Sequence, residues 1–218
     1  MEPRSYIHEG AFGRVEVSQF DLPADAYPVL LEAGRIAWDI ETNGLDPHDA
    51  KIGTCQIYAE GVGIFIVTSL AEEVPPNLSR LLSDERVLKV FHHAPFDLSF
   101  MTAAWGISPK NTACTKIAAK LLSPGAPSEH FSLKYLMAHH FNLHLDKQVR
   151  FTDWLAKTLT PIQIEYAAGD VIRLLDLYDA LTEKIDSRNL KDLYSECVRF
   201  LPTHVKLRLL GCPDPFKY

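Results

Sequence analysis

Two acidic residues stand two positions apart in the segment Trp38-Asp39-Ile40-Glu41. Side chains at positions i and i+2 of a β-strand project from the same face, about 7 Å apart along the backbone. Two anions on an otherwise apolar strand are costly unless they are paired, hydrogen-bonded, protonated or bound to a metal ion. The pair therefore predicts a carboxylate site that suits metal binding or acid–base chemistry.

Further groups of the same chemical type follow later in the chain. Asp97 comes after an apolar segment and the pair His92-His93, at a predicted corner between a strand and a helix. Tyr166 and Asp170 are four residues apart, so that a helix places them on one face. Asp97 and Asp170 could add metal ligands, and Tyr166 could add a group that handles protons.

Each pattern also has a purely structural interpretation. Asp39 and Glu41 fit a strand end at which both carboxylates face water. Asp97 fits the first turn of a helix, where the macrodipole favours an acidic residue. Tyr166 and Asp170 fit the rim of an amphipathic helix. Taken singly, these patterns do not separate structure from function.

Hydrophobic periodicity predicts the elements that must position these residues. Residues 35–41 are predicted to form a strand, because Ile36, Trp38 and Ile40 would face one side and Ala37, Asp39 and Glu41 the other. Four more strands and several helices follow, with strands in the first half and helices in the second. The further strands are predicted at 51–58, 64–67, 87–91 and 111–114, and the helices at 76–82, 95–105, 115–122 and 190–200. This order predicts an α/β domain with a mixed five-stranded sheet flanked by helices.

One long helix is predicted to begin at Thr160. Thr160-Pro161-Ile162-Gln163 offers an N-cap threonine, a proline at the first helical position and a glutamine placed for a capping box. Apolar residues continue at helical spacing to Leu181. We expect little structure in residues 201–218.

Composition excludes several classes of protein. The chain has 218 residues, 22 Lys and Arg against 28 Asp and Glu, and a net charge of −6. A protein that coats long nucleic acid needs a broad basic surface, which this balance does not favour. No signal peptide or membrane-spanning segment is predicted, and four scattered cysteines indicate reduced thiols. We therefore expect a cytoplasmic protein with no membrane partner.

The motifs, taken in order, resemble the DEDD exonuclease superfamily in its tyrosine-containing branch, and ribonuclease D in particular. The matching segments are WDIETNGL from residue 38, HHAPFDL from residue 92, LDK from residue 145, TDWL from residue 152 and YAAGDV from residue 166. The resemblance covers about residues 30–185 and implies a ribonuclease H-like (DnaQ-like) 3′–5′ exonuclease fold.

Two other segments resemble the compact nanoRNase C subfamily, which degrades dinucleotides. They are CTKIAAKL from residue 114 and CVRFLPT from residue 197. This resemblance implies a homo-oligomeric ring, for which an octamer is one size, and short RNA or dinucleotide substrates. It divides the chain into an N-terminal extension (1–30), a catalytic domain (31–185) and a C-terminal helix and tail (186–218) that contributes oligomer contacts.

The resemblance also implies a mechanism. Asp39, Glu41, Asp97 and Asp170 would hold two divalent ions, Mg²⁺ or Mn²⁺, because all the ligands are hard oxygens. One ion would activate a water molecule and the other would stabilise the departing 3′ oxygen. Tyr166 would orient or deprotonate the attacking water. The product would be a nucleoside 5′-monophosphate.

Substrate contacts are expected around the same motifs. Thr42 and Leu45 follow the first motif, and the resemblance implies that Leu45 wedges between two bases. A turn leucine that covers the core edge is the alternative. His92 and His93 could contact phosphate, or could be packed or exposed without a role in binding. The basic run 147–150 could reach a 5′ phosphate or simply face solvent.

Other functions stay open at this stage. An exonuclease that trims longer RNA or DNA would use the same fold, and fold does not decide function. A catalytically inactive nucleic-acid-binding scaffold is a second class, although all four acids and the tyrosine are present. A small-molecule phosphatase explains none of the flanking segments.

Overall fold

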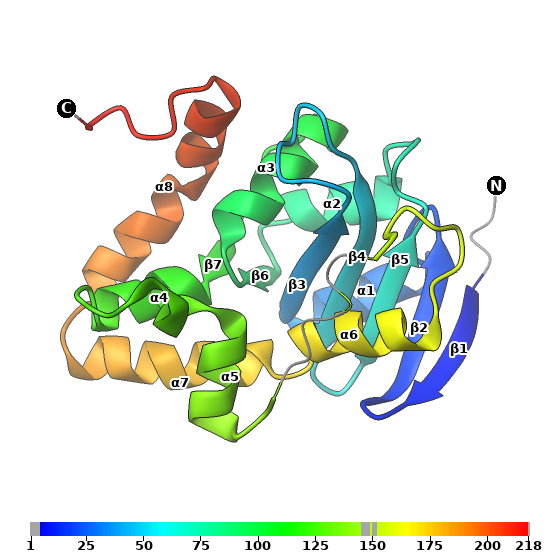
Figure 1. The fold of residues 1–218 in the computed structure, drawn as a ribbon, viewed down its shortest axis with the longest axis horizontal. Coiled ribbons are helices and arrows are strands. Elements are labelled where there is room, and N and C mark those ends of the chain that lie inside the picture. Colours follow the sequence, from blue (N-terminus) through cyan, green and yellow to red (C-terminus); the bar gives the residue numbers. More distant parts are fainter. Residues whose placement is uncertain (1–4, 145–148, 150–151, 218) are drawn as a thin grey trace.

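A mixed sheet forms the centre of the molecule (Figure 1). The computed structural model describes residues 5–144, 149 and 152–217. In the described residues, seven strands pair in the order β1-β2-β5-β4-β3-β6-β7. They are β1 (Ser5–Gly10), β2 (Gly13–Gln19), β3 (Arg35–Thr42), β4 (Ile52–Ala59), β5 (Gly63–Thr68), β6 (Leu88–Phe91) and β7 (Thr112–Cys114). Strand β3 pairs antiparallel with β4 and parallel with β6, and so it occupies the interior of the sheet.

Helices cover both faces of this sheet, and Figure 1 shows α6 in front of the strands and α1 behind them. The back is covered by α1 (Ala26–Ala33), α2 (Pro76–Ser83) and α3 (Ala94–Trp105). The front carries α4 (Thr115–Leu122), the 3-10 helix η1 (Ser128–Phe131), α5 (Leu133–Phe141), α6 (Pro161–Val171) and α7 (Leu174–Ser187). Helix α8 (Lys191–Leu209) packs against α3 and α4.

The two faces of β3 have different chemistry, as its alternating sequence predicts. Ile36, Trp38 and Ile40 belong to the core behind the sheet and are 0–4% exposed. Ala37 belongs to the core under α6, and Asp39 and Glu41 continue along that same face as half-buried side chains. We call this side of β3 the carboxylate face.

The predicted α/β class and mixed sheet are confirmed, but the number of five strands is wrong. The five predicted strands are present as β3 to β7, and the other two come from residues 5–19. Strand β2 does alternate, with Val15 and Val17 buried, whereas β1 is an edge strand with mostly exposed side chains. Such an edge strand leaves little hydrophobic signal. The division of the chain at residue 31 stays a prediction.

The predicted long helix is in fact two helices. The chain turns at Ile172 and Arg173, because α6 packs on β3, β4 and β5 whereas α7 packs mainly on α4. Arg173 lies at this turn, where its guanidinium pairs with Asp176 at 2.7 Å and stacks over the Phe141 ring at 4.8 Å.

The C-terminal helix is longer than predicted. Helix α8 continues through Pro202 to Leu209, although an internal proline removes a helical hydrogen bond. Leu201 and Val205 flank the proline and are buried in the core that α3 shares, at 2% and 1% exposure. Their burial offsets the proline penalty, which the local sequence does not reveal.

Two further observations concern membrane-spanning helices and the cysteines. Among the described helices, none is both long and apolar enough to cross a membrane. All four cysteines lie in the described part of the chain, and each is a free thiol.

Candidate active site

The candidate active site lies on the carboxylate face, toward the C-terminal end of β3. Asp39 lies opposite Gln56 of β4 in the strand register, and the Gln56 side-chain amide donates to an Asp39 carboxylate oxygen at 2.6 Å. Gln56 is itself fully buried and receives a hydrogen bond from Thr54. This chain of polar groups fixes the orientation of the Asp39 carboxylate.

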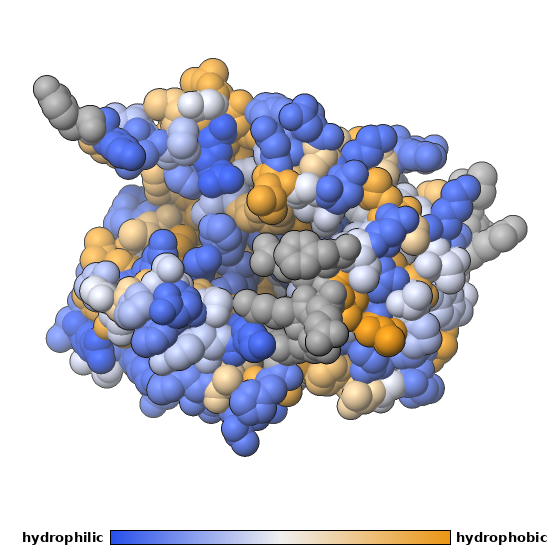
Figure 2. Space-filling view, viewed as in Figure 1, coloured by the Kyte–Doolittle hydropathy of each residue, from blue (hydrophilic) through white to orange (hydrophobic). Residues whose placement is uncertain are grey.

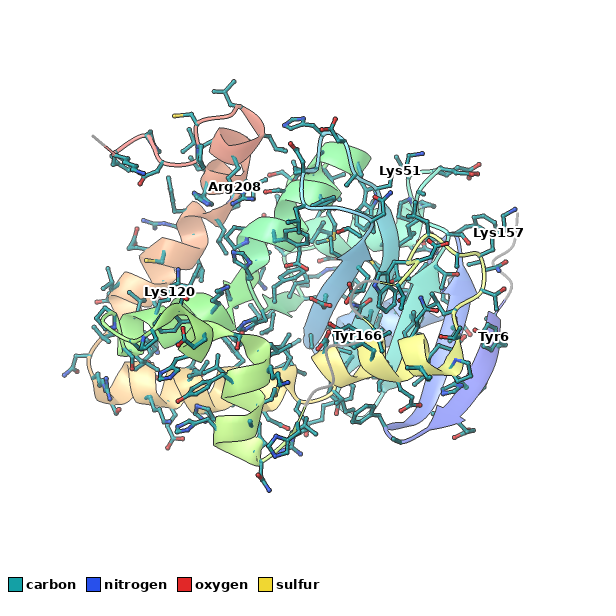
Figure 3. All side chains as sticks on the ribbon, viewed as in Figure 1. Tyr6, Lys51, Lys120, Lys157, Tyr166 and Arg208 are labelled. Carbon is teal, nitrogen blue, oxygen red and sulfur yellow. The ribbon has the colours of Figure 1, made fainter. Side chains whose placement is uncertain are left out.

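Helix α6 brings the last predicted motif to this face. Its residues Ala167, Ala168 and Val171 are buried in the core under the helix, while Tyr166 and Asp170 are half-buried beside it. Figure 3 labels Tyr166 on α6, next to β3. Carboxylate oxygens of Asp39, Glu41 and Asp170 all lie within 4.8 Å of one another. A set of three hard oxygen donors at this spacing fits a divalent cation such as Mg²⁺.

Asp97 is positioned by α3, next to the β6 edge of β3. It lies in the first turn of α3, directly after β6, the parallel neighbour of β3. Asp97 lies outside the group of three, but its carboxyl interacts electrostatically with Asp39. Burial and the charge of Asp39 raise the pKa of Asp97 well above its ordinary value, and the backbone of Ile40 partly offsets this.

The same crowding affects Asp39. Burial raises the pKa of Asp39 to about 7, against the opposing hydrogen bonds from Gln56 and the Ile40 backbone. Carboxylic acids that are reluctant to ionise in the apoprotein become good metal ligands once a cation supplies the missing positive charge.

A short segment before α6 supports the tyrosine. Thr160 and Gln163 form the predicted capping box, and the Gln163 amide also donates to Thr152 Oγ1 and to the Asp153 carbonyl. The ring of Trp154 lies 5.7 Å from the Tyr166 ring.

Glycine at position 53 makes room for this segment. A Cβ atom on Gly53 would lie 2.2 Å from the Trp154 carbonyl oxygen. Strand β4 therefore needs a glycine where the backbone beside Tyr166 passes closest.

Leu45 projects from the loop between β3 and β4 and is 74% exposed. The loop is held by its own hydrogen bonds: Thr42 Oγ1 donates to the Gly44 carbonyl at 2.6 Å, and Asn43 Oδ1 accepts from the Lys51 backbone at 2.7 Å. His48 connects the loop to the Leu209 carbonyl of α8. An ordered loop thus presents a large apolar side chain to solvent.

The two histidines predicted as possible phosphate contacts, His92 and His93, differ in their surroundings. Both ring nitrogens of His92 are used inside the protein, one with Thr115 Oγ1 at 2.8 Å and one with the Phe131 carbonyl at 3.0 Å. Burial lowers the pKa of His92 to about 3, so its ring is neutral. His93 is exposed and takes a left-handed backbone conformation, φ 74°, at the start of α3.

Basic side chains surround His93. Partial desolvation, and then the charges of Lys116, Arg208, Lys120 and His204, lower the pKa of His93. Figure 3 labels Lys120 on α4 and Arg208 on α8, and Figure 2 shows hydrophilic residues in the hollow between α8 and the strands. Positive charge therefore gathers around His93, at the start of the helix that carries Asp97, in a chain whose net charge is −6.

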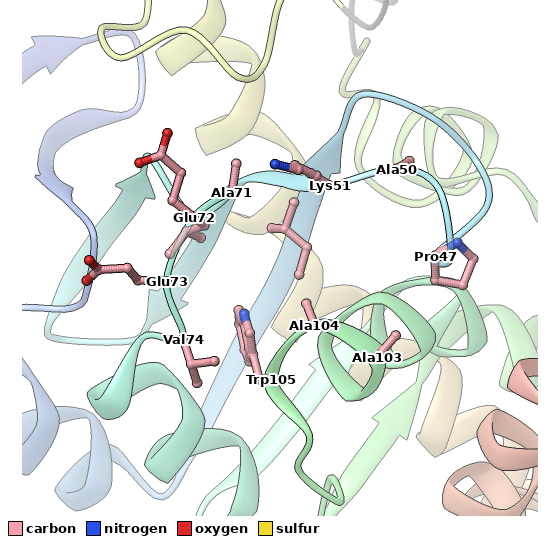
Figure 4. A pocket seen from close by; sticks show the side chains of 12 residues that line it. Pro47, Ala50, Lys51, Ala71, Glu72, Glu73, Val74, Ala103, Ala104 and Trp105 are labelled. Atoms are coloured by element: carbon pink, nitrogen blue, oxygen red, sulfur yellow. The ribbon is translucent and has the colours of Figure 1, made fainter.

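A separate pocket of about 240 Å³ adjoins the loop that carries Leu45, whose residues Pro47, Ala50 and Lys51 help to line it (Figure 4). Trp105 and Ala104 at the end of α3 form one wall, and Glu72, Glu73 and Lys51 stand at its rim. None of the predicted site residues lines it.

The sequence motifs include the acidic groups but not the residues that support them. Gln56, the partner of Asp39, is a polar residue within the mostly apolar strand β4. A polar residue at such a position indicates a buried hydrogen bond and could have been noticed in the sequence. Lys120 and Arg208 gave no signal, because only the packing of α4 and α8 brings them near His93. Lys147, Gln148 and Arg150 lie outside the described residues.

Comparison with known proteins identifies the class. The family described as 3'-5' exonuclease matches residues 15–186. The chain therefore belongs to the 3'-5' exonuclease family, as its motifs predict.

Its relatives narrow this placement. The ribonuclease D of Haemophilus influenzae is 30% identical over 154 residues, which are 71% of this chain and 38% of that protein. The structure of Brucella melitensis NrnC is 31% identical with a TM-score of 0.85, and the match covers 94% of this chain and 98% of that one. Escherichia coli RNase D has a TM-score of 0.71 at 27% identity, over 84% of this chain and 48% of that one.

These likenesses confirm a DnaQ-like exonuclease fold that is ribonuclease D-like and close to nanoRNase C. The chain spans well under half of its Haemophilus relative, at 38%. In contrast, it matches the Brucella protein over nearly the full length of both chains.

Proposed function

We propose that this protein is a metal-dependent 3′–5′ exoribonuclease that releases nucleoside 5′-monophosphates from very short RNA. The observation that carries the proposal is the group of three carboxylates from β3 and α6, within 4.8 Å of one another and next to Tyr166. Family membership supports the reaction class.

Asp39, Glu41 and Asp170, with Asp97 beside them, would hold two divalent cations. The donor set is all oxygen, which suits Mg²⁺ or Mn²⁺ better than softer metals. A structure of the similar Brucella NrnC is described with bound Mg²⁺. When bound, such cations supply positive charge that stabilises the phosphate and acidifies a nearby water.

Tyr166 would orient the attacking water. Its phenol is carried by α6 beside Asp170, and Trp154 packs against its ring. Acting as the phenolate, Tyr166 would take a proton from the water as the water oxygen forms its bond to phosphorus, the general-base role. The P–O3′ bond would break, and the departing 3′ oxygen would take up a proton from solvent water to become the 3′ hydroxyl of the remaining nucleotide.

The features around the carboxylates favour a small substrate. Leu45, at 74% exposure on an ordered loop, would insert beside a base, and Thr42 would shape that loop through its bond to Gly44. His93 and its basic neighbours would contact a phosphate, while His92 would hold the neighbouring backbone in place. A structure of Brucella NrnC is described as bound to pGG.

The length of the substrate can be measured directly. We expect single-turnover cleavage of 5′-phosphorylated RNA to be fastest for two nucleotides and slower for three, seven and twenty. Equal or faster cleavage of the longer RNAs would replace the dinucleotide assignment by an RNA-trimming one. DNA oligomers of the same lengths, included in the series, test whether the enzyme also acts on DNA. If no oligomer is cut in Mg²⁺ or Mn²⁺, the protein is a binding scaffold and the catalytic proposal fails.

Leu45 offers a test of base contact. Leu45→Ala should raise the KM for a dinucleotide about tenfold, since base stacking contributes about 1–3 kcal/mol. The matched control is Val29→Ala, which shortens an exposed apolar side chain of α1 on the opposite side of the sheet. An unchanged KM for Leu45→Ala would mean that this leucine does not contact the base.

We also propose that the protein is a homo-oligomeric ring in the cytoplasm. Apolar side chains are exposed on α8 and the following tail: Leu193 (50%), Phe200 (40%), Leu210 (79%) and Phe216 (85%). Residues of this kind on one terminal element fit a contact between copies. Light scattering at micromolar concentration should give an oligomer, and a monomer would refute the ring.

A further inference from the structure

The N-terminal hairpin formed by β1 and β2 is hydrogen-bonded to α6 at Glu165, the residue next to Tyr166. The Glu165 carboxylate uses both oxygens: one lies 2.8 Å from His8 Nε2, and the other accepts from the Ala11 backbone N–H at 3.0 Å. The His8 and Glu165 side chains are only 17% and 27% exposed. One carboxylate thus joins segments more than 150 residues apart.

The hairpin leaves just enough space for this carboxylate. A Cβ atom on Gly10 would lie 1.5 Å from Glu165 Oε1, so any other residue there would displace the carboxylate. The backbone at Gly10 needs no left-handed conformation, since Gly10 is not among the residues with positive φ. The glycine therefore serves the close approach and not a turn.

Hairpin strand β1 contributes little to the core. It is an edge strand that pairs with β2 alone, and five of its six residues are exposed. His8 and Gly10 are residues of β1 that lie against Glu165 of the site-bearing helix α6. Among the described elements, α6 is the one that β1 contacts most after its partner strand β2.

We infer that Glu165 is a positioning residue for catalysis: its attachment to the hairpin fixes the rotation of α6 and so holds Tyr166 toward Asp39 and Glu41. This inference rests on the proposed function, because it assigns Tyr166 a role in the reaction. Displacements of a reacting group by about 1 Å can cost up to about a hundredfold in rate. The attachment acts on orientation, so it affects the chemical step more than substrate binding.

Three variants test this inference in the full-length protein with Mg²⁺ and a 5′-phosphorylated dinucleotide. Glu165→Ala and Gly10→Ala should each lower kcat about tenfold and leave KM within about twofold. Glu165→Gln should keep most of the rate, because its amide oxygen still accepts from the Ala11 N–H. Glu9→Ala, which shortens an exposed acidic side chain of the same strand, is the matched control and should behave as the wild type.

A double-mutant cycle separates positioning from general weakening of the fold. In a Tyr166→Phe background, Glu165→Ala should cause almost no further loss of kcat, because the group that it positions is already absent. A tenfold loss in both backgrounds, or no loss in either, would overturn the inference.

Hydrogen exchange keeps the inference testable if the wild type proves inactive. Glu165→Ala and Gly10→Ala should speed amide exchange in residues 164–171 and leave α8 unchanged. Unchanged exchange in α6 would refute the attachment itself, whereas absence of cleavage by the wild type refutes only the proposed function.

Discussion

The two faces of strand β3 carry different tasks. Ile36, Trp38 and Ile40 point to the back, where Trp38 stacks with Phe91 at a ring-centroid distance of 6.0 Å. Asp39 and Glu41 point to the front, where they face each other's charge and that of Asp170. The back face stabilises the fold by burial of apolar area. On the front face the carboxylates lie close together, and a bound cation would compensate their charges. Stability and chemistry are thus separated by a single-residue alternation.

The largest effect is expected on the front face. Asp39→Asn keeps the shape of the side chain but removes one of the proposed anionic ligands, so kcat should fall by about a thousandfold or more. Calorimetric titration with Mg²⁺ should show weakened binding as well. The metal-free variant should be at least as stable as the wild type, because a buried charge has been removed. A variant that still cleaves at the wild-type rate would show that Asp39 is not a metal ligand.

A matching change on the back face should have the opposite profile. Ile36→Ala removes fully buried methyl groups, which costs about 2–5 kcal/mol of unfolding free energy. The rate per folded molecule should stay within about twofold, since no site residue is altered. Urea unfolding combined with cleavage assays checks both expectations. A large loss of rate without a loss of stability would contradict the division between the two faces.

Tyr166→Phe sharpens the role of the front face. The change removes only the phenolic oxygen, and kcat should fall about a hundredfold with little change in KM. Steady-state kinetics on a dinucleotide measures both parameters. The control is Tyr135→Phe, which removes the hydroxyl of a tyrosine on α5 that stacks on His139, outside the candidate site. A raised KM at unchanged kcat would make Tyr166 a binding residue instead.

A further effect concerns pH. The carboxyl of Asp39 ionises at about 7 in the folded apoprotein but at about 4 in the unfolded chain. The unfolded state therefore binds fewer protons between these values, and the stability of the metal-free protein should fall as pH rises from about 4 to about 7. The raised pKa of Asp97 acts in the same direction.

Thermal unfolding in EDTA across this pH range measures the effect. Asp39→Asn should flatten the slope, whereas Asp25→Asn, a change at an exposed position before α1, should leave it as in the wild type. Equal slopes for the wild type and Asp39→Asn would mean that burial does not raise the pKa of Asp39.

Local patterns made much of this fold predictable. The alternation of residues 35–41 gave β3 and the direction of Asp39 and Glu41, because both follow from the period of a strand. The cap at Thr160 located the start of α6, because capping involves only neighbouring residues. The exonuclease resemblance then joined motifs that lie far apart in the sequence.

Features that depend on packing could not be predicted in this way. The hydrogen bond from Gln56 to Asp39 requires the register of two strands, and the bend after Val171 depends on which surfaces α6 and α7 cover. The extension of α8 past Pro202 depends on burial against α3. Glu165 contacts His8, which is 157 positions away in the sequence, and Ala11, which is 154 positions away. Local sequence patterns carry no information about contacts at such separations.

The central claim is that the carboxylate face of β3 is a metal-dependent site for cleavage of short RNA. The most direct test incubates the purified protein with a 5′-phosphorylated RNA dinucleotide in Mg²⁺, in EDTA, and in EDTA followed by excess Mg²⁺, and separates the products by chromatography. We predict nucleoside 5′-monophosphates in the first and third reactions and none in the second. Cleavage that persists in EDTA, or products that carry a 3′ phosphate, would contradict the claim.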